Sequence, residues 1–363
     1  MLIQTIKPVA KIGFQLSTTN VHEISGYCAA EMAFEEANAK GDLPIALELV
    51  LINDKVIPEV ARNAAQEFVG DPLAVGMLGP IFSTMAVTTL DIYNNAGMAQ
   101  VSSEASSPLL TSQGYKNFFR IVANDEVQGR QLAKVAVMYL KAKRIAVLSD
   151  NTAWGRPIAQ IFFNEAERLG CKPVLLSFFG EKEGKLDFSD LVKTTLDANP
   201  DLVYFAVYWN KAHIITHKLR DHGVEAVFLG SDALKPYAFL EVPSLDKVAP
   251  YHTLSAIDMR IKPSAREFFK NFGMKYPTLL DAPQSAAEAY DVANMMIEAV
   301  RRAGEVDRAK VLYEFQNLGV YQGVIGEIRF DDHGDIMNAE IGLYQCKDGM
   351  RNYIGPVREL IIE

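Results

Sequence analysis

Short apolar segments alternate with longer amphipathic segments over most of this 363-residue chain. Apolar runs of about four to eight residues between turn residues are typical of buried strands, whereas apolar positions at helical spacing indicate helices. Strands that alternate with helices predict parallel sheets covered by helices. The expected strands are Ala10–Leu16, Ala46–Ile52, Ala74–Leu78, Met98–Ser102, Arg144–Ser149, Pro173–Phe178, Leu202–Val207 and Ala226–Gly230.

Between these strands lie segments with a helical pattern, and the alternation occurs twice. It pauses near Phe118–Val122 and then begins again. Each half therefore carries several strand–helix units, which predicts two doubly wound, Rossmann-like α/β domains. The length agrees, because about 250 to 300 residues is the usual limit for one core. The expected helices are Ser25–Ala39, Pro58–Val69, Thr84–Ala96, Val127–Lys141, Arg156–Leu169, Phe188–Ala198 and Lys211–His222.

The last third of the chain has a different pattern. A mainly helical block, Pro263–Gln316, follows the extended segment VAPYHTLSAI, and two strands are expected after it at Val324–Phe330 and Ala339–Gln345. One interpretation makes the block a third, helical subdomain. In the other, the chain crosses between two lobes near Val122, Ser255 and Phe330. Lobe 1 then comprises residues 1–122 and 256–330, lobe 2 comprises residues 123–255 and 331–363, and a ligand cleft lies between them.

The composition is that of a globular protein and argues against a nucleic-acid partner. The formal net charge is −9, and the sequence contains no basic tract. Its apolar runs are strand-sized, so no membrane-spanning helix is expected. The N-terminus lacks the pattern of a signal peptide. This leaves two possibilities, a mature periplasmic or extracellular chain and a cytoplasmic one.

Motifs for metal, redox and catalytic chemistry are missing. The three cysteines, Cys28, Cys171 and Cys346, form no CxxC pair. We expect Cys28 to pack on a helix face, and a Cys171–Cys346 bond is the minor alternative. His213 and His217 have the spacing of metal ligands, but lysines and an arginine surround them, which favours a solvated helix face. GxGxxG, GxxxxGK[ST], GxSxG and HExxH are all absent, so neither a cofactor nor a metal is expected.

Hydroxyl side chains gather where two of the expected strands end. Ser83 and Thr84 follow VGMLGP, and a serine cluster follows MAQV at Ser102, Ser103, Ser106 and Ser107. Serine and threonine cap helix N-termini, where unpaired N–H groups and a partial positive charge bind anions. Because ligands of α/β sheets bind at the carboxyl ends of strands, we expect the two clusters to meet at one small anion.

In the second half, aromatic and acidic residues follow the strand ends. Trp154 comes shortly after Ser149, Tyr208 and Trp209 come after Val207, and Asp232 comes after Gly230. Core packing explains each tryptophan singly, and a helix cap explains Asp232. Together they predict a site in which Asp232 meets an ammonium group and the hydroxyl clusters meet a carboxylate. No activated nucleophile or base accompanies them, so the chain is not expected to be an enzyme.

The sequence resembles the type I periplasmic binding proteins of ABC transporters, close to the leucine/isoleucine/valine-binding group. The resemblance covers nearly the whole chain. It implies two Rossmann-like lobes joined by three hinge strands that close on a ligand. The segments that carry it are KIGFQL, AAEMAFEEANAKG, STMAVTTLDIYNNAG, SSPLLTSQGYKNFFRI, DFSDLV, DLVYFAVYWNKA and IGEIRFDDHGD.

The resemblance also implies roles for single residues. The family's carboxylate-binding serine falls on Ser83, and its cap segment falls on Ala105 and Ser106, directly after Glu104. The aromatic residue before a glycine falls on Trp154, the tyrosine after a strand on Tyr208, and the acid that pairs with the ligand ammonium on Asp232. In the first loop, the alignment leaves open whether His22 or Glu23 reaches the ligand.

Departures from the family pattern leave the ligand open. The disulfide of the branched-chain members cannot form, because its positions read Asp54–Lys55 and Ile81–Phe82. Trp154 replaces the family's tyrosine and Glu104 a small residue. The implied function is binding of an amino acid and its delivery, by a monomer, to a membrane ABC permease. The alternatives are a binding protein for an aromatic carboxylate or amide, and a ligand-sensing regulator of the same fold.

Overall fold

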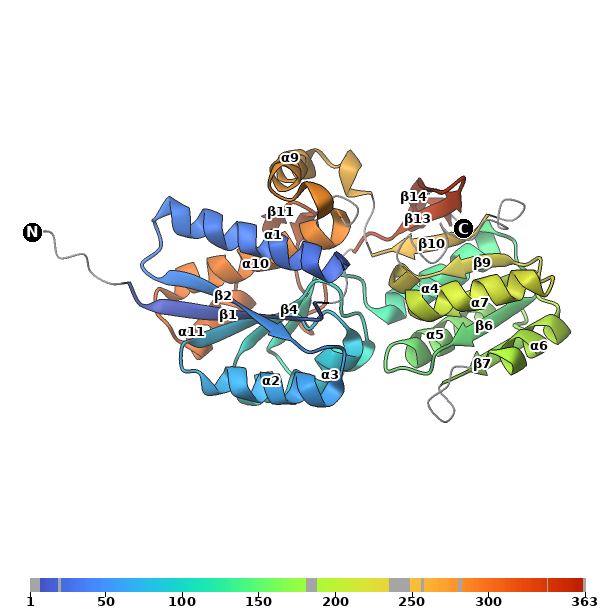
Figure 1. Cartoon of the computed structure of the whole chain (residues 1–363), viewed down its shortest axis with the longest axis horizontal. Coiled ribbons are helices and arrows are strands. Elements are labelled where there is room, and N and C mark those ends of the chain that lie inside the picture. The colour runs from blue at the N-terminus through green and yellow to red at the C-terminus, as the bar shows by residue number, and fades with distance from the viewer. Residues whose placement is uncertain are drawn as a thin grey trace, which may run out of the picture. The chain divides into compact units, whose positions relative to one another are not determined.

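The structure is a computed structural model that describes residues 7–18, 21–180, 188–234, 249–255, 258–279, 283–337 and 339–361. The chain divides into two compact units. Figure 1 shows the whole chain, coloured by residue number. Unit 1 comprises Met1–Val122 and Asp258–Ala339, and unit 2 comprises Ala123–Ile257 and Glu340–Glu363. The expected boundaries after residues 255 and 330 fall after residues 257 and 339 in this division. The boundary expected after residue 330 differs most, and Asp335, which lies between the expected and the observed boundary, pairs with Arg120 of unit 1.

The core of unit 1 is a five-stranded sheet in the order β2-β1-β3-β4-β5. All neighbouring strands are parallel. Because parallel strands are covered on both faces, β3 and β4 are buried along their whole length. The strands are β1 (Val9–Leu16), β2 (Ala46–Asn53), β3 (Ala74–Leu78), β4 (Ala99–Ser102) and β5 (Phe118–Arg120).

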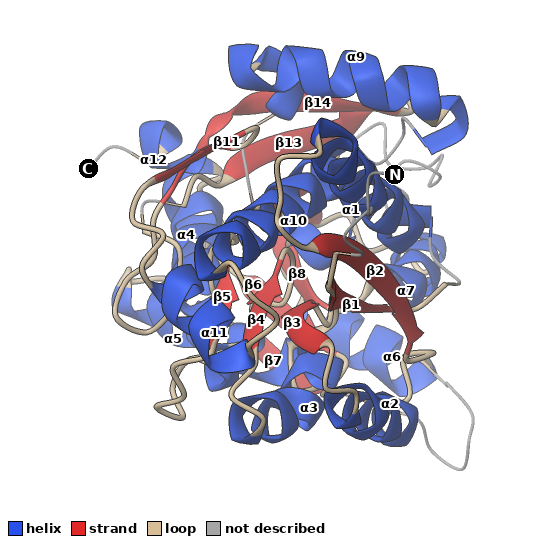
Figure 2. Cartoon of the chain, turned by 90° about the vertical axis from the view of Figure 1, so that its left-hand side faces the viewer, coloured by secondary structure: helices blue, strands red, loops and turns tan. Residues whose placement is uncertain are grey.

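Helices cover both faces of this sheet. Helices α2 and α3 contact each other on one face, and α1 contacts α10 on the other (Figures 1 and 2). The helical block of the last third belongs to unit 1, so it is not a separate subdomain. The helices are α1 (Val21–Lys40), α2 (Pro58–Gly70), α3 (Ser83–Asn95), α9 (Arg266–Lys275), α10 (Pro283–Ala303) and α11 (Arg308–Gln316), with short 3₁₀ turns at Pro108–Leu110, Met259–Ile261, Pro263–Ala265 and Pro277–Leu279.

Unit 2 contains a seven-stranded sheet in the order β14-β13-β10-β9-β8-β6-β7. The strands from β7 to β10 pair in parallel, whereas β13 and β14 add an antiparallel edge. The strands are β6 (Ile145–Ser149), β7 (Leu175–Phe178), β8 (Leu202–Ala206), β9 (Val227–Gly230), β10 (Tyr251–Leu254), β13 (Gly342–Lys347) and β14 (Met350–Pro356).

Alternating residues of β8 show how the helices of unit 2 are placed. Val203 and Phe205 pack among residues of α6 and α7. Tyr204, between them, points to the opposite face and stacks on Phe162 of α5 at a centroid distance of 4.0 Å. The helices are α4 (Asp125–Lys134), which continues as a π-helical turn (Val135–Tyr139), α5 (Gly155–Arg168), α6 (Ser189–Ala198), α7 (Trp209–Asp221) and α12 (Val357–Leu360), with a 3₁₀ turn at Asp232–Leu234.

The expected single strand Val324–Phe330 is wrong. The structure has a hairpin of β11 (Tyr321–Gly323) and β12 (Gly326–Ile328) instead. The buried carboxylate of Asp291 accepts the N–H groups of Val324 and Ile325, both at 2.8 Å, which fixes the turn between the strands. The sequence pattern missed it because the turn residues are themselves apolar.

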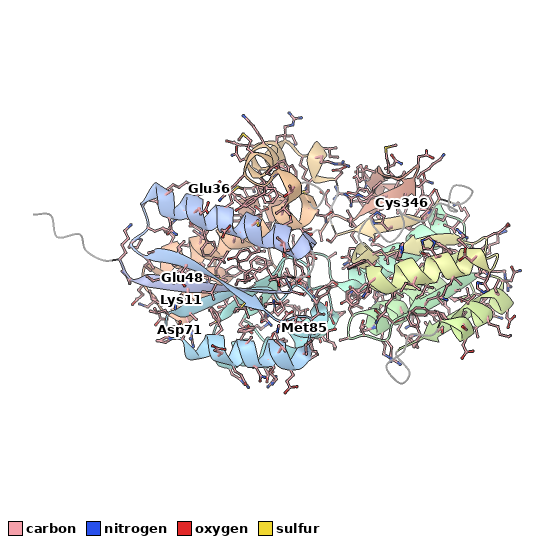
Figure 3. The ribbon with its side chains drawn as sticks, viewed as in Figure 1. Lys11, Glu36, Glu48, Asp71, Met85 and Cys346 are labelled. Atoms are coloured by element: carbon pink, nitrogen blue, oxygen red, sulfur yellow. The ribbon has the colours of Figure 1, made fainter. Side chains whose placement is uncertain are left out.

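The three cysteines are unbonded to one another. The Cys171 thiol lies 3.5 Å from the carbonyl of Lys143. Cys346 of β13 (Figure 3) is buried in the core beneath α6 and α7. A Cys171–Cys346 disulfide, the minor alternative, is therefore wrong.

Candidate functional site

The two hydroxyl clusters of unit 1 meet at Ser83. This residue begins α3, directly beyond the end of β3, and only 3% of it is exposed. Its hydroxyl oxygen accepts the backbone N–H groups of Ser106 at 3.2 Å and Ser107 at 3.1 Å. Within the described residues, the Ser83 hydroxyl proton has no acceptor, so it can be donated to a ligand.

Ser102 shapes the loop that supplies these N–H groups. Its hydroxyl donates to the carbonyl of Pro80 at 2.9 Å and accepts the N–H groups of Ala105 at 2.9 Å and Glu104 at 3.3 Å. Ala105 is fully buried, whereas Glu104 is half-buried. A tight loop of this kind presents its N–H groups beside the positive end of α3, an arrangement that suits a carboxylate.

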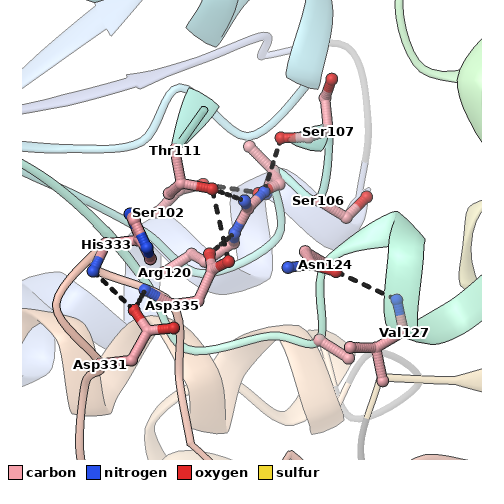
Figure 4. Close-up of polar contacts among 12 residues, drawn as sticks. Ser102, Ser106, Ser107, Thr111, Arg120, Asn124, Val127, Asp331, His333 and Asp335 are labelled. Carbon is pink, nitrogen blue, oxygen red and sulfur yellow. Dashed lines mark hydrogen bonds and ion pairs between the residues drawn. The ribbon is translucent and has the colours of Figure 1, made fainter. Parts of the chain in front are cut away.

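Arg120 is a residue of this region that the sequence reasoning missed. It ends β5 and lies beneath the serine loop, without any exposed surface (Figure 4). A single charged residue at the end of the apolar run FF was the only signal in the sequence.

In unit 2, the predicted aromatic and acidic residues also gather at strand ends. The ring of Trp154 lies 5.0 Å from that of Tyr208, centroid to centroid. Trp154 is 2% exposed, and its indole N–H donates to the carboxylate of Asp125 at 3.1 Å. The carboxylate of Asp232 accepts the amide N–H of Gln128 at 3.0 Å.

The pKa of Tyr208 depends on its burial and on the charges around its hydroxyl. Burial raises its pKa well above 10, and the carboxylates of Asp150, Asp125 and Asp232 raise it further. Tyr208 therefore remains a protonated hydrogen-bond donor at neutral pH. Carboxylates from three separate elements therefore lie near one hydroxyl, and that of Asp150 pairs with the ammonium group of Lys211 at 3.7 Å.

Asp125 and Gln128 were not predicted. Both are fully buried in the first turns of α4, which begins directly after the crossing into unit 2. The sequence signal is the cap residue Asn124, whose side chain accepts the N–H of Val127 at 3.0 Å. An acidic residue after a cap is common at helix starts, so the pattern did not distinguish Asp125 from an ordinary first-turn acid.

The glycine after Trp154 is required by close packing. A Cβ atom on Gly155 would lie 2.5 Å from Oδ1 of Asp150 and 2.7 Å from the carbonyl oxygen of Ala206. We expect Gly155→Ala to lower the free energy of unfolding by about 1 to 3 kcal/mol, as overpacking does. Urea denaturation checks this against Gly180→Ala, since a Cβ at Gly180 meets open space. Equal stability of the two variants would contradict the packing explanation.

The remaining candidates have simpler roles or lie outside the described structure. The Glu23 carboxylate accepts the N–H of Ser17 at 2.6 Å. The side chain of His22 lies outside the described residues. Trp209 is 39% exposed at the start of α7. The rings of His213 and His217 lie 4.7 Å apart. In the described part of the chain, no three histidine, cysteine or acidic side chains are clustered so that they could hold a metal ion.

Comparisons with known proteins show the family to which this chain belongs. The periplasmic binding protein family model matches residues 11–350. A Leu/Ile/Val-binding protein homolog of Brucella abortus is 27% identical over 329 residues, which are 89% of this chain and 86% of that protein. Within the described residues, no helix has the length and apolarity needed to span a bilayer.

Solved structures share the fold. A leucine-binding protein of Thermotoga maritima superposes with a TM-score of 0.84 at 23% identity, covering 96% of this chain and 98% of that one. A solute-binding protein of R. palustris in complex with benzoate gives a TM-score of 0.82 at 16% identity, covering 96% of each chain. The α/β fold and the resemblance predicted from the sequence are confirmed. The chain belongs to the periplasmic binding protein family and is a solute-binding protein rather than an enzyme.

Proposed function

We propose that this protein binds an amino acid as a zwitterion and delivers it to an ABC permease. The ligand carboxylate accepts the hydroxyl proton of Ser83, whose oxygen is held by the N–H groups of Ser106 and Ser107, and the ligand ammonium binds to Asp232. The observation that carries the proposal is the Ser83 hydroxyl, which gathers two N–H groups of the serine loop at the N-terminus of α3. The ammonium end of the proposal is supported by the Asp232 carboxylate of unit 2, which the Gln128 amide holds by a hydrogen bond.

The proposal assigns one end of the ligand to each unit. Periplasmic binding proteins close their two lobes on a ligand, and the proposal is that the permease recognises the liganded form. The protein acts in the periplasm or outside the cell, as a monomer. Relatives named as Leu/Ile/Val-binding proteins support an amino-acid ligand.

An aromatic carboxylate is the second candidate. The paired rings of Trp154 and Tyr208 favour it, because aromatic rings stack on one another. The benzoate complex of a protein with the same fold supports it as well. In this case the Ser83 cluster keeps its role and Asp232 makes no contact with an ammonium group.

A thermal-shift screen tests the proposal. The purified chain is heated with each standard amino acid, with aromatic acids such as benzoate, and with small amides. A ligand of the native state stabilises it by about 2.7 kcal/mol at a hundredfold excess over Kd. We expect shifts with one or more amino acids. Shifts with aromatic acids alone would replace the amino acid by the second candidate.

A further inference from the structure

Arg120 forms hydrogen bonds with the loop at which, according to the proposed function, the ligand carboxylate binds. Its guanidinium donates to the carbonyl oxygens of Ala105 at 3.2 Å and Ser107 at 2.8 Å. It also donates to the hydroxyl of Thr111 at 2.7 Å and to the carboxylate of Asp335 at 2.5 Å (Figure 4). The guanidinium therefore holds the loop at both sides of Ser106.

These contacts determine where the loop N–H groups point. A trans peptide unit is planar, so its C=O and N–H bonds point in opposite directions. Since the Ala105 carbonyl faces Arg120, the N–H of Ser106 in the same peptide unit faces away from it, toward the Ser83 hydroxyl at 3.2 Å. Without the guanidinium, the Ala105 carbonyl would lose its donor, and within this set of contacts that peptide unit would keep only the bond from the Ser106 N–H to the Ser83 hydroxyl.

Charge alone does not explain the arrangement. Asp335 pairs with Arg120, and the two side chains are 15% and 0% exposed. The nearby carboxylate compensates most of the guanidinium charge for any anion on the far side of the loop. The guanidinium is a planar group with donors in several fixed directions. A lysine at this position would lack this geometry.

We propose that Arg120 is a positioning residue that gives the site its preference for a carboxylate over the corresponding carboxamide. The inference rests on the proposed function in one respect, namely that a ligand carboxylate binds at Ser83 and Ser106. Arg120 does not touch the ligand, because the loop lies between them. It aligns the N–H groups that hold the Ser83 hydroxyl, and a hydroxyl donates more strongly to a charged oxygen than to a neutral one.

The test compares carboxylates with their amides in the intact chain. Calorimetry gives Kd for each standard amino acid and its carboxamide, and for benzoate and benzamide. The test variant is R120M/D335N, which removes both charges and so leaves no unpaired carboxylate. The control is R308M, because Arg308 also binds backbone carbonyls, those of Val69, Asp71 and Ala74, in the same unit.

We expect R120M/D335N to weaken carboxylate binding by about tenfold or more, with amide binding changed by less than about threefold. R308M should leave the ratio of carboxylate to amide affinity unchanged. If circular dichroism shows the double variant unfolded, R120K is measured instead, and the same selective loss is expected.

Each outcome decides between the two proposals. Equal weakening of acid and amide would overturn the role of Arg120 and leave the amino-acid function standing. If only benzoate shows a selective loss of affinity, the role of Arg120 is supported and the proposed amino-acid ligand is overturned. Absence of binding by every carboxylate tested in the wild type would overturn both.

Discussion

Replacing Asp232 by asparagine is expected to weaken the binding of a zwitterionic amino acid by about thirtyfold to a thousandfold, or about 2 to 4 kcal/mol. The asparagine keeps the shape of the side chain and a carbonyl oxygen for Gln128, which now donates at 3.0 Å. The negative charge that attracts the ligand ammonium is lost. Calorimetric titration of the wild type and the variant with the amino acid found by screening measures the change.

The matched control for this variant is Asp197→Asn in the same unit. Asp197 pairs with Lys193 on the surface of α6, where both side chains are well exposed. Surface pairs contribute at most about 1 kcal/mol, and this one has no contact with the candidate site. Equal affinity of Asp232→Asn and Asp197→Asn would exclude an ammonium at Asp232 and favour the aromatic carboxylate.

His252→Phe is expected to remove an acid sensitivity from unit 2. His252 lies on β10 at 1% exposure and stacks on Tyr344 at 5.4 Å. Burial above all, together with the charge of Arg351, lowers its pKa to about 3, and the hydrogen bond with the Thr253 carbonyl opposes this shift. Below pH 6.5 the unfolded chain binds a proton that the folded chain does not, so stability falls as the pH falls from about 6.5 toward 3.

Between pH 7 and pH 5 this single group should remove about 2 kcal/mol of unfolding free energy from the wild type. The phenylalanine retains the ring stacking and cannot bind a proton, so the variant should lose less over the same interval. Urea denaturation at both pH values measures the difference, with the exposed His222→Gln as the control. Parallel loss in wild type and His252→Phe would show that His252 does not carry the sensitivity.

The parallel core was predictable from the sequence, because fully buried strands are continuous apolar runs. Ala74–Leu78 was expected and found with the same bounds. The placement of Ser83, Tyr208 and Asp232 at the ends of strands followed from the same pattern. Short or mixed segments were less predictable. The three-residue strand Phe118–Arg120 is too short to show a periodicity of its own, and it pairs with β4 and, through Arg120, with Asp335.

Residues that act through tertiary contacts could not be found in this way. Arg120 lies fifteen residues from Ala105 in sequence and more than two hundred from Asp335, yet it touches both. Gln128 and Asp232 come from distant segments of unit 2 as well. Sequence spacing predicts neighbours within one helix or at one strand end, whereas these pairs depend on how the sheets and their loops pack.

The most direct test of the central claim is a calorimetric comparison of three forms of one ligand. The amino acid that gives the largest thermal shift is titrated beside its carboxamide, which lacks the carboxylate, and its deaminated acid, which lacks the ammonium. If Ser83 and Asp232 bind opposite ends of one zwitterion, both analogues should bind at least about thirtyfold more weakly than the amino acid. Equal affinity of the deaminated acid and the amino acid would contradict the zwitterion site.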